Sequence, residues 1–231
     1  MNISVCMATH NGEKYLRQQV DSILAQLSGH DELIISDDNS SDTTLSILHS
    51  YNDSRIMLLE SKKFGSPSRN FEHALTHCRN SFIFLADQDD IWHPDKITVM
   101  KAALEKNDLV VCDCEIVNEN LSTLHHSFFS QNHSRSGLIK NFVKNSFIGC
   151  CMAFRKPVLT KALPFPENIP FHDQWIGLIA ERYFTVAFIP EVLVAHRRHF
   201  NNYSSTGEKS EVSFRDKIKL RFHLAKELLD H

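Results

Sequence analysis

Short apolar runs alternate with amphipathic runs through the first half of this chain, and this alternation constrains its fold more than any other feature. The apolar runs predict strands at about residues 2–8, 32–36, 55–60, 81–86 and 108–112. The runs between them predict helices at about residues 13–27, 42–50, 67–79 and 94–106. Near-continuous apolar strands that alternate with helices are typical of a parallel sheet covered on both faces. The predicted fold class is therefore α/β, with a mainly parallel central sheet and helices on both faces.

The alternation weakens after about residue 113, where residues 118–137 are polar and rich in His, Ser and Asn. A polar stretch of this length predicts a long loop or an excursion on the acceptor side. Two further strand-like runs, 150–154 and 183–188, flank a helix predicted near residues 173–182. Because no internal repeat or low-complexity linker interrupts the pattern, we expect these elements to form one domain.

Charge and cysteine usage narrow the class of protein. The 231 residues are 42% hydrophobic, enough for a sizeable core, and the formal net charge of −3 gives no reason to expect nucleic acid as a partner. The first residues run into a strand without the basic lead of a signal peptide, and no apolar run reaches the length of a membrane-spanning helix. Six cysteines, including Cys112, Cys114, Cys150 and Cys151, lack the spacing of a zinc site or a disulfide framework. We therefore expect reduced core thiols in a cytoplasmic protein.

The strand predicted at 81–86 ends in three carboxylates within four positions, Asp87, Asp89 and Asp90. In a parallel α/β sheet, such a strand end lies at the mouth of the ligand crevice. Asp87 and Asp89 are two apart on an extended chain, so they project on the same side and can approach one cation. Crowded carboxylates with no basic residue between them favour a hard divalent ion, Mg²⁺ or Mn²⁺, which commonly holds a diphosphate. An acidic turn that caps the following helix is the alternative, since Pro94 suits a first helical turn.

The first two predicted strands also end in polar clusters, at residues 8–13 and 36–42. Thr9, Asn11 and a Gly at a strand-to-helix turn can approach a nucleotide closely, with the helix N-terminus facing its phosphates. In the second cluster a carboxylate such as that of Asp38 can accept hydrogen bonds from a base imide or a ribose hydroxyl. Either cluster alone is compatible with an ordinary capped turn. Polar clusters at three successive strand ends, however, favour a nucleotide site.

Two later motifs add candidates for chemistry. Asp173, at the start of the helix predicted near 173–182, is a candidate general base or an N-cap. Trp175 either packs in the core or forms a platform for a sugar ring. Near the end of the chain, His199 can complete a metal shell and Arg198 can neutralise a diphosphate, although a solvated basic loop is equally compatible with these residues.

Taken together and in order, these motifs resemble the family 2 glycosyltransferases with the GT-A fold. The resemblance rests on residues 8–12, 36–42, 87–96 and 172–175. It covers about residues 2–205 and implies a GT-A domain over 1–205, followed by a separate C-terminal helix within 206–231. In that domain, residues 1–112 would form the nucleotide-binding half and 113–205 the acceptor-side half.

The resemblance also implies roles for single residues. Asp89 would lie nearest the metal, and Asp173 falls where the family places the base that activates the acceptor. The residues expected at the nucleotide sugar are Thr9, Asn11, Asp38, Arg69, Asp87, Trp175 and Arg198, and those expected at the metal are Asp87, Asp89 and His199. Residues 196–202 are similar to the Arg-Gln-His-x-x-Asn element of the bacterial rhamnosyltransferase-like branch, with Arg198 in place of Gln. The Gln-x-x-Arg-Trp element of processive synthases is missing from the sequence, so we expect the transfer of one sugar or a few.

The implied activity is inverting, metal-dependent transfer of a sugar with Mn²⁺ or Mg²⁺. The donor would be dTDP-rhamnose or a UDP-hexose, and the acceptor a glycan or lipid-linked glycan of a bacterial surface polysaccharide. Two other classes stay open. A nucleotidylyltransferase should carry a Gly-rich, basic loop after the first strand, where this chain has only Gly12. A non-catalytic sugar-binding domain would not need Asp87, Asp89 and Asp173 together.

The last residues, 214–231, predict an amphipathic helix with a basic flank. Its apolar stripe consists of Phe214, Ile218, Leu220, Phe222, Leu224, Ala225, Leu228 and Leu229, and its basic flank of Arg215, Lys217, Lys219 and Arg221. This pattern is typical of a helix drawn to anionic lipid, here at the inner face of the plasma membrane. The alternatives are a helix packed against the catalytic core and a homodimer contact.

Overall fold

The computed structural model describes residues 2–167, 169, 171–199 and 214–231, and the side chains of its last helix from residue 219 onward. Strands and helices alternate through the first part, as the sequence predicts. They are β1 (Ile3–Thr9), α1 (Leu16–Leu24), β2 (Glu32–Asp37), α2 (Thr44–His49), β3 (Ile56–Leu58), α3 (Pro67–Thr76), β4 (Phe82–Ala86), β5 (Ile91–Trp92), α4 (Lys96–Leu104) and β6 (Leu109–Val117). Leu16, Val20 and Ile23 form the buried stripe of α1, and Pro67 lies in the first turn of α3. The two residues of β5 are too few to leave a periodic signal.

The part after β6 contains more regular structure than the sequence predicts. It consists of β7 (Thr123–His125), α5 (Phe128–Asn132), α6 (Leu138–Val143), the 3₁₀ turn η1 (Gly149–Cys151), β8 (Met152–Arg155), α7 (Lys156–Ala162), α8 (His172–Tyr183), β9 (Val186–Arg197) and α9 (Phe214–Asp230). The predicted loop over 118–137 is therefore wrong. β7 pairs with β6, and Ser127 caps α5 by accepting a hydrogen bond from the Ser130 amide. Such short elements have no periodic pattern of apolar residues that would reveal them. In α5, for example, only Phe128 is buried.

The strand β9 is twice the length of the run that predicted it, because a bulge lets it continue past Pro190. Cys112 of β6 pairs with Ile189, but the next residue of β6, Asp113, pairs with Val192. Residues 190 and 191 are thus left out of the ladder, which is how a proline is accommodated within a sheet. The strand then pairs onward to Arg197 and delivers the residues after it to the site described below.

The sheet is mixed rather than mainly parallel. Its strand order is β3-β2-β1-β4-β8-β6-β9-β5, with β7 paired to β6. The pairings from β3 to β4 are parallel, as is β6 with β9, whereas β8 runs antiparallel to both β4 and β6. The predicted α/β class is confirmed. The antiparallel direction of β8 was not predicted, because its partners β4 and β6 lie far away in the sequence.

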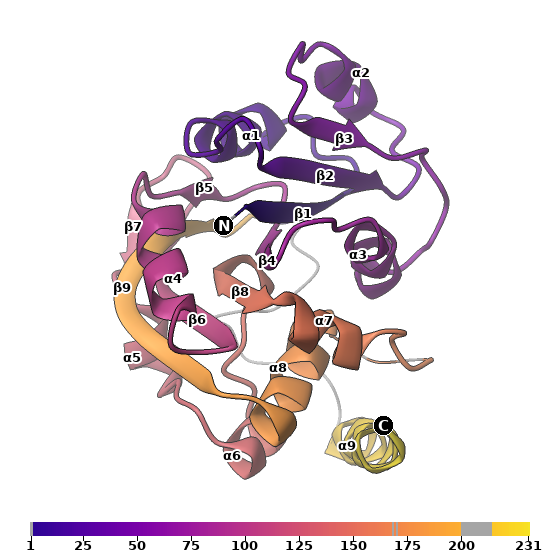
Figure 1. Ribbon diagram of the computed structural model, residues 1–231, viewed down its shortest axis with the longest axis vertical. Helices are drawn as coiled ribbons and strands as arrows, with labels where there is room; N and C mark the ends of the chain where they lie inside the picture. Colours follow the sequence, from indigo (N-terminus) through magenta and orange to yellow (C-terminus); the bar gives the residue numbers. More distant parts are fainter. Residues whose placement is uncertain (1, 168, 170, 200–213) are drawn as a thin grey trace.

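Helices cover both faces of the parallel part of the sheet (Figure 1). The chain moves outward from β1 through β2 to β3 and then returns past β1 to β4. Because such crossovers are right-handed, this reversal places α3 on the face opposite α1 and α2. The carboxyl ends of β1, β2 and β4 consequently lie along one edge of the sheet, which is where a ligand crevice forms in α/β folds.

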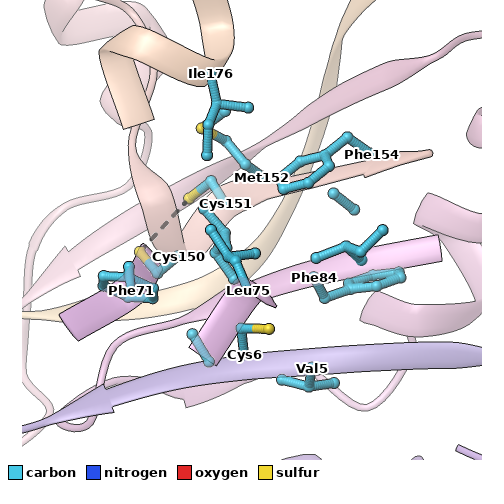
Figure 2. Packing of buried hydrophobic residues seen from close by; sticks show 14 of the residues in the cluster. Val5, Cys6, Phe71, Leu75, Phe84, Cys150, Cys151, Met152, Phe154 and Ile176 are labelled. Atoms are coloured by element: carbon cyan, nitrogen blue, oxygen red, sulfur yellow. Dashed lines mark hydrogen bonds between the residues drawn. The ribbon is translucent and has the colours of Figure 1, made fainter. Parts of the chain in front are cut away.

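The core lies between the sheet and its helices. Figure 2 shows one region of it, in which Phe71 and Leu75 of α3, Cys6 of β1 and Ile176 of α8 belong to one cluster of buried side chains. All six cysteines are free thiols, and all are buried, as the sequence predicts. Burial of these apolar side chains supplies most of the driving force for folding.

The C-terminal helix α9 packs against the rest of the domain (Figure 1). Leu224 and Leu228 are buried, the Arg182 guanidinium donates to the Leu228 carbonyl, and Lys161 Nζ donates to the carbonyl of His231 at 2.7 Å. The inner face of α9 thus belongs to the fold, as one of the sequence alternatives proposed. Its outer face differs, because the side chain of Phe222 is 75% exposed. In the part of the chain that the structure describes, no helix combines the length and hydropathy needed to cross a bilayer.

Candidate active site

The ends of β1, β2 and β4 are joined by short polar contacts. The side-chain amide of Gln88 contacts His10 twice, because Oε1 accepts from the His10 amide and Nε2 donates to its carbonyl, both at 2.9 Å. The Asp38 amide donates to the Thr9 carbonyl at 2.8 Å. A Cβ at Gly12 would lie 2.3 Å from Gln88 Oε1, so a larger residue here would displace the Gln88 amide from its two contacts with His10. The three polar motifs of the sequence are therefore parts of one structure.

Thr9 and Asp38, both predicted to meet the nucleotide, differ in exposure. Thr9 is only 1% exposed, and its hydroxyl donates to Asp37 Oδ2 at 2.9 Å. Asp38 is half-buried, and its Oδ1 accepts hydrogen bonds from the amides of Phe64 and Gly65 at 2.6 and 3.0 Å. Thr9 therefore contributes by holding the end of β2, while Asp38 orders the segment that follows β3.

Asn11 and Arg69 each contact a different segment of the chain. Asn11 is exposed, has a φ of +47°, and accepts a hydrogen bond from the Ser41 amide at 2.8 Å. The guanidinium of Arg69 contacts Glu72 at 2.5 Å and the carbonyl oxygens of residues 165 and 166 at 3.2 Å. In this structure Arg69 thus ties α3 to the segment between α7 and α8.

The carboxylates after β4 occupy contrasting electrostatic environments. Burial, together with the neighbouring charges of Asp90 and Asp89, raises the pKa of Asp87 to about 8. Asp90 is fully buried but lies 3.0 Å from His196 Nδ1. Burial alone would raise the pKa of Asp90, but the imidazolium of His196 outweighs it and holds this pKa below its usual value. The same pair holds the pKa of His196 well above its usual value, although burial opposes this.

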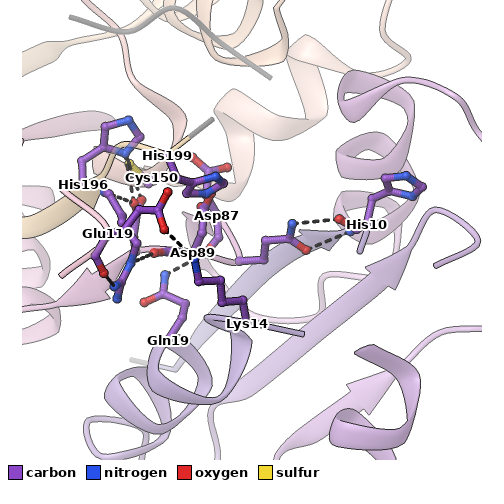
Figure 3. A network of polar contacts seen from close by, with 12 residues as sticks. His10, Lys14, Gln19, Asp87, Asp89, Glu119, Cys150, His196 and His199 are labelled. Carbon is purple, nitrogen blue, oxygen red and sulfur yellow. Dashed lines mark hydrogen bonds and ion pairs between the residues drawn. The ribbon is translucent and has the colours of Figure 1, made fainter. Parts of the chain in front are cut away.

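The residues that follow β9 reach this cluster and hold it in place (Figure 3). His199 Nε2 lies 2.7 Å from Asp89 Oδ2, and both side chains are largely buried. Arg197 fixes the backbone beside them, because its amide donates to Asp90 Oδ1 at 2.9 Å and its Nε donates to the Asp89 carbonyl at 2.8 Å. The sequence alone could not show that Asp89 contacts His199, because 110 residues separate them in the chain.

Asp87, Asp89 and His199 suit a divalent cation. Carboxylate oxygens with one imidazole nitrogen are a donor set for Mn²⁺ or Mg²⁺. The raised pKa of Asp87 is an observation of this structure that supports the fit, because it reports negative charges crowded together. A bound cation would relieve that repulsion.

Asp173 lies in the first turn of α8, and its charge adds to the repulsion that raises the pKa of Asp87. Its carboxylate accepts hydrogen bonds from the amides of Gln174, at 2.6 Å, and Gly149. Burial nevertheless raises the pKa of Asp173 to about 6. The N-cap position of α8 belongs to Phe171, so the alternative role of Asp173 as N-cap is wrong.

Trp175 lies in the core, one of the two positions that the sequence left open. It is fully buried, and its Nε1 donates to the Ala162 carbonyl at 2.9 Å, so it offers no face to a sugar ring. The Arg198 amide extends the ladder by donating to the Val117 carbonyl at 2.8 Å. Residues 200–202 of the last motif lie outside the described residues.

Sequence reasoning missed three members of this cluster: His196, Arg197 and Cys150. His196 lies between Asp90 and the Cys150 thiol, whose Sγ is 3.7 Å from its Nδ1. Arg197 also donates to the Glu119 carbonyl and to Gln18 Oε1, both at 2.8 Å. A charged residue at the end of an apolar run, as Arg197 is, was the signal in the sequence, but its burial and its partners are visible only in the fold.

The model of the family described as "Glycosyl transferase family 2" matches residues 4–163. This chain belongs to glycosyltransferase family 2. It is 32% identical over 188 residues to an Escherichia coli enzyme named UDP-Glc:alpha-D-GlcNAc-diphosphoundecaprenol beta-1,3-glucosyltransferase, covering 78% of this chain and 70% of the relative. It is 27% identical to the dTDP-rhamnosyl transferase of Shigella flexneri, covering 92% of this chain and 77% of the relative.

The fold agrees with the family. Staphylococcus aureus TarS (residues 1–349), in a crystal structure with UDP-GlcNAc, superposes with a TM-score of 0.76 at 20% identity and covers 98% of this chain and 66% of that chain. The family 2 chain described here therefore has the GT-A fold. It spans about two thirds of the length of the curated relatives it matches, between 64% and 70% for three of them.

Proposed function

We propose that this family 2 chain is an inverting glycosyltransferase that moves one sugar from a nucleotide-diphosphate sugar to an acceptor hydroxyl. The observation that carries the proposal is the convergence of Asp87, Asp89 and His199 at the carboxyl edge of the sheet, with Asp173 close enough to influence Asp87. A binding domain has no need of a buried base beside a cation site. Family membership and the GT-A fold support the same activity.

Asp87, Asp89 and His199 would hold Mn²⁺ or Mg²⁺, which when bound neutralises charge on the departing nucleoside diphosphate. Asp38 and Asn11 line the neighbouring strand ends, where the base and ribose of the donor would lie. Arg198 follows β9 on the same side of the sheet and is the candidate cation for the diphosphate.

Asp173 would remove the proton of the acceptor hydroxyl as its oxygen attacks the anomeric carbon. With a pKa of about 6, this carboxylate is mostly ionised at neutral pH and still basic enough to accept a proton. A base on the attacking side leads to inversion by direct displacement, with an oxocarbenium-like transition state.

The relatives narrow the substrates that we propose. The names of the two relatives above contain UDP-Glc and dTDP-rhamnosyl, and one acceptor named is a diphosphoundecaprenol glycan. We accordingly propose a UDP-hexose or dTDP-rhamnose as donor and a glycan or lipid-linked glycan of a bacterial surface polysaccharide as acceptor. The cytoplasmic face of the plasma membrane is the location that fits such an acceptor.

The test of the reaction is the release of nucleoside diphosphate from a panel of nucleotide sugars, with and without acceptor glycans. We expect release with Mn²⁺ or Mg²⁺ and none with excess EDTA, and the product should carry the inverted anomeric configuration. Consumption of a nucleoside triphosphate and a sugar phosphate instead would identify a nucleotidylyltransferase and refute the proposal.

Helices α6 and α9 offer a surface that could lie on the membrane. Ile139, Val143, Phe222 and Leu229, here called the α6–α9 surface, are 81%, 55%, 75% and 75% exposed. Arg221 joins the two helices by donating to the Val143 carbonyl at 2.5 Å. Exposed Lys219 and Lys226 accompany these apolar side chains, a combination suited to anionic lipid.

Co-sedimentation with anionic vesicles tests this contact. Phe222→Ser combined with Leu229→Ser should reduce binding, whereas Leu124→Ser, at a 53% exposed position on β7, should not. Binding that is absent in the unmodified chain, or unaffected by the double substitution, would rule out the membrane contact and leave a protein interface as the role of this surface.

A further inference from the structure

A second group of ligand-type side chains lies behind Asp89 and His199. The thiol of Cys150, the imidazole of His196 and the carboxylates of Asp90 and Asp87 offer one ligand atom each, and these four atoms lie within 4.8 Å of one another. Cys150, His196 and Asp90 are buried, whereas Asp87 is half-buried and forms the open side of the group. Figure 3 shows Cys150 and His196 adjacent to each other beside the cluster that contains Asp87 and Asp89.

The spacing of these atoms matches a tetrahedral zinc site. Typical bond lengths of zinc to sulfur, nitrogen and oxygen place S and N about 3.6 Å apart, and N and O about 3.4 Å apart. Here Cys150 Sγ lies 3.7 Å from His196 Nδ1, and Asp90 Oδ2 lies 3.3 Å from the same nitrogen. The other oxygen of Asp90 is held by the Arg197 amide at 2.9 Å, which orients the carboxylate as outer-shell partners of metal ligands do.

We propose that Cys150, His196, Asp90 and Asp87 form an inner site that binds a borderline-soft divalent ion, Zn²⁺, separate from the outer position at Asp89 and His199. The thiolate decides the selectivity, because sulfur favours zinc over the hard ions Mg²⁺ and Mn²⁺. On binding, the ion replaces the proton of the Cys150 thiol and any protons on His196 Nδ1 and the Asp87 carboxyl, and these protons leave to solvent. Asp87 is the residue common to both positions, so an ion in the inner site withdraws it from the outer one.

This site is not visible in the sequence, because its ligands come from three separate segments. Asp87 and Asp90 follow β4, Cys150 lies in η1, and His196 lies near the end of β9. The spacing rules for zinc sites describe ligands close together in the chain. They do not detect a group whose members are brought together by β8 and β9.

Cobalt titration of the purified, metal-stripped protein tests the proposal. Co²⁺ is a spectroscopic substitute for Zn²⁺, and its bond to a thiolate produces a near-ultraviolet charge-transfer band that carboxylate and imidazole ligands do not produce. We expect this band on adding Co²⁺, its loss on adding Zn²⁺, and its persistence in excess Mg²⁺. Cys150→Ser and Cys150→Ala should abolish it and weaken Zn²⁺ binding by at least ~10-fold.

Cys78→Ser is the matched control, since Cys78 is also a buried thiol but contacts Cys6, with 3.1 Å between the sulfur atoms. It should leave the band unchanged. No band in the unmodified chain at saturating Co²⁺, or a band that survives in both Cys150 variants while their thermal melts remain cooperative, would overturn the inner site. The titration contains no nucleotide sugar, so its outcome is independent of whether the proposed transfer reaction is found.

Discussion

The two regions that build the site differ in how far apart their parts lie in the chain. From β1 to β4, the crossover helices α1 and α2 join neighbouring parallel strands, and α3 returns the chain from β3 past β2 and β1 to β4, so the polar strand ends gather at one edge. After β5, most sheet neighbours are remote in the chain: β8 lies between β4 and β6, and β9 pairs with both β6 and β5. The first region supplies the carboxylates Asp87 and Asp89, and the second supplies His196, His199 and Asp173.

The difference matters because the second region decides what the first region's carboxylates do. Asp87 and Asp90 are three residues apart at the end of the same strand. The pKa of Asp87 is raised to about 8 by burial and its acidic neighbours, whereas His196 keeps the pKa of Asp90 low. The position of a carboxylate in the sequence therefore does not predict its pKa. The partner that folding places beside it does.

The largest expected effect tests this contrast directly. Asp90→Asn should lower the free energy of unfolding by about 3–5 kcal/mol, because it leaves His196 buried without its carboxylate partner. Asp87→Asn should raise it at pH 8 by about 1 kcal/mol, a reduced figure because Asp87 is half-exposed to solvent screening. Urea unfolding of the metal-free protein measures both.

The two substitutions should also differ in pH dependence. Since the pKa of Asp87 is raised in the folded state, its contribution to stability is lost as pH rises towards 8, so the gain from Asp87→Asn should grow from pH 5 to pH 8. The pH dependence of the Asp90 contribution has the opposite sign, because folding lowers the pKa of Asp90. Its stabilising contribution is therefore present at pH values above the pKa of Asp90 in the unfolded chain and is lost on acidification. Equal effects of both substitutions would break the contrast.

Asp173→Asn should reduce kcat by at least ~100-fold, since the amide keeps the shape of the side chain but cannot accept a proton. Donor affinity should hardly change, because Asp173 acts on the acceptor. Steady-state kinetics and calorimetric donor titration separate the two quantities, with Asp230→Asn, an exposed position on α9, as control. If about a tenth of the activity remained, Asp173 would have a structural role only.

Asp89→Ala and His199→Ala compare one ligand from each region. Each should weaken Mn²⁺-dependent binding of a nucleoside diphosphate by ~10- to 100-fold. The double variant should lose less binding free energy than the sum of the losses in the two single variants, because the side chains lie 2.7 Å apart and would hold the same ion. Fluorescence or calorimetric titrations with Mn²⁺ and with EDTA supply the data. Full metal dependence in His199→Ala would confine the cation to the first region.

The smallest effect concerns the attachment of α9 to the second region. Leu228→Ala should lower the free energy of unfolding by about 2 kcal/mol, the low end of the range for buried leucine, because the helix lies at the surface. Leu229→Ala, its 75% exposed neighbour, should change stability by less than ~0.5 kcal/mol. Equal losses in thermal or urea melts would mean that α9 does not pack as described.

The sequence alone predicted the first region well. The strands and helices from β1 to α4, except β5, appear near the expected residues, because apolar runs and helix-start signals are local. It also predicted the α/β class and the buried thiols. The three motifs after β1, β2 and β4 were readable because strand ends in a parallel sheet share one edge.

Only the tertiary structure decided the rest. The antiparallel direction of β8, the bulge that carries β9 past Pro190, and the short elements in residues 118–137 cannot be read from local apolar patterns. Trp175 was assigned to the core by packing, and the Asp90–His196 pair spans 106 residues. Sequence patterns report the preferences of neighbouring residues, whereas a site of this kind depends on which distant segments the sheet makes adjacent. That choice is made by the burial and pairing of the whole chain.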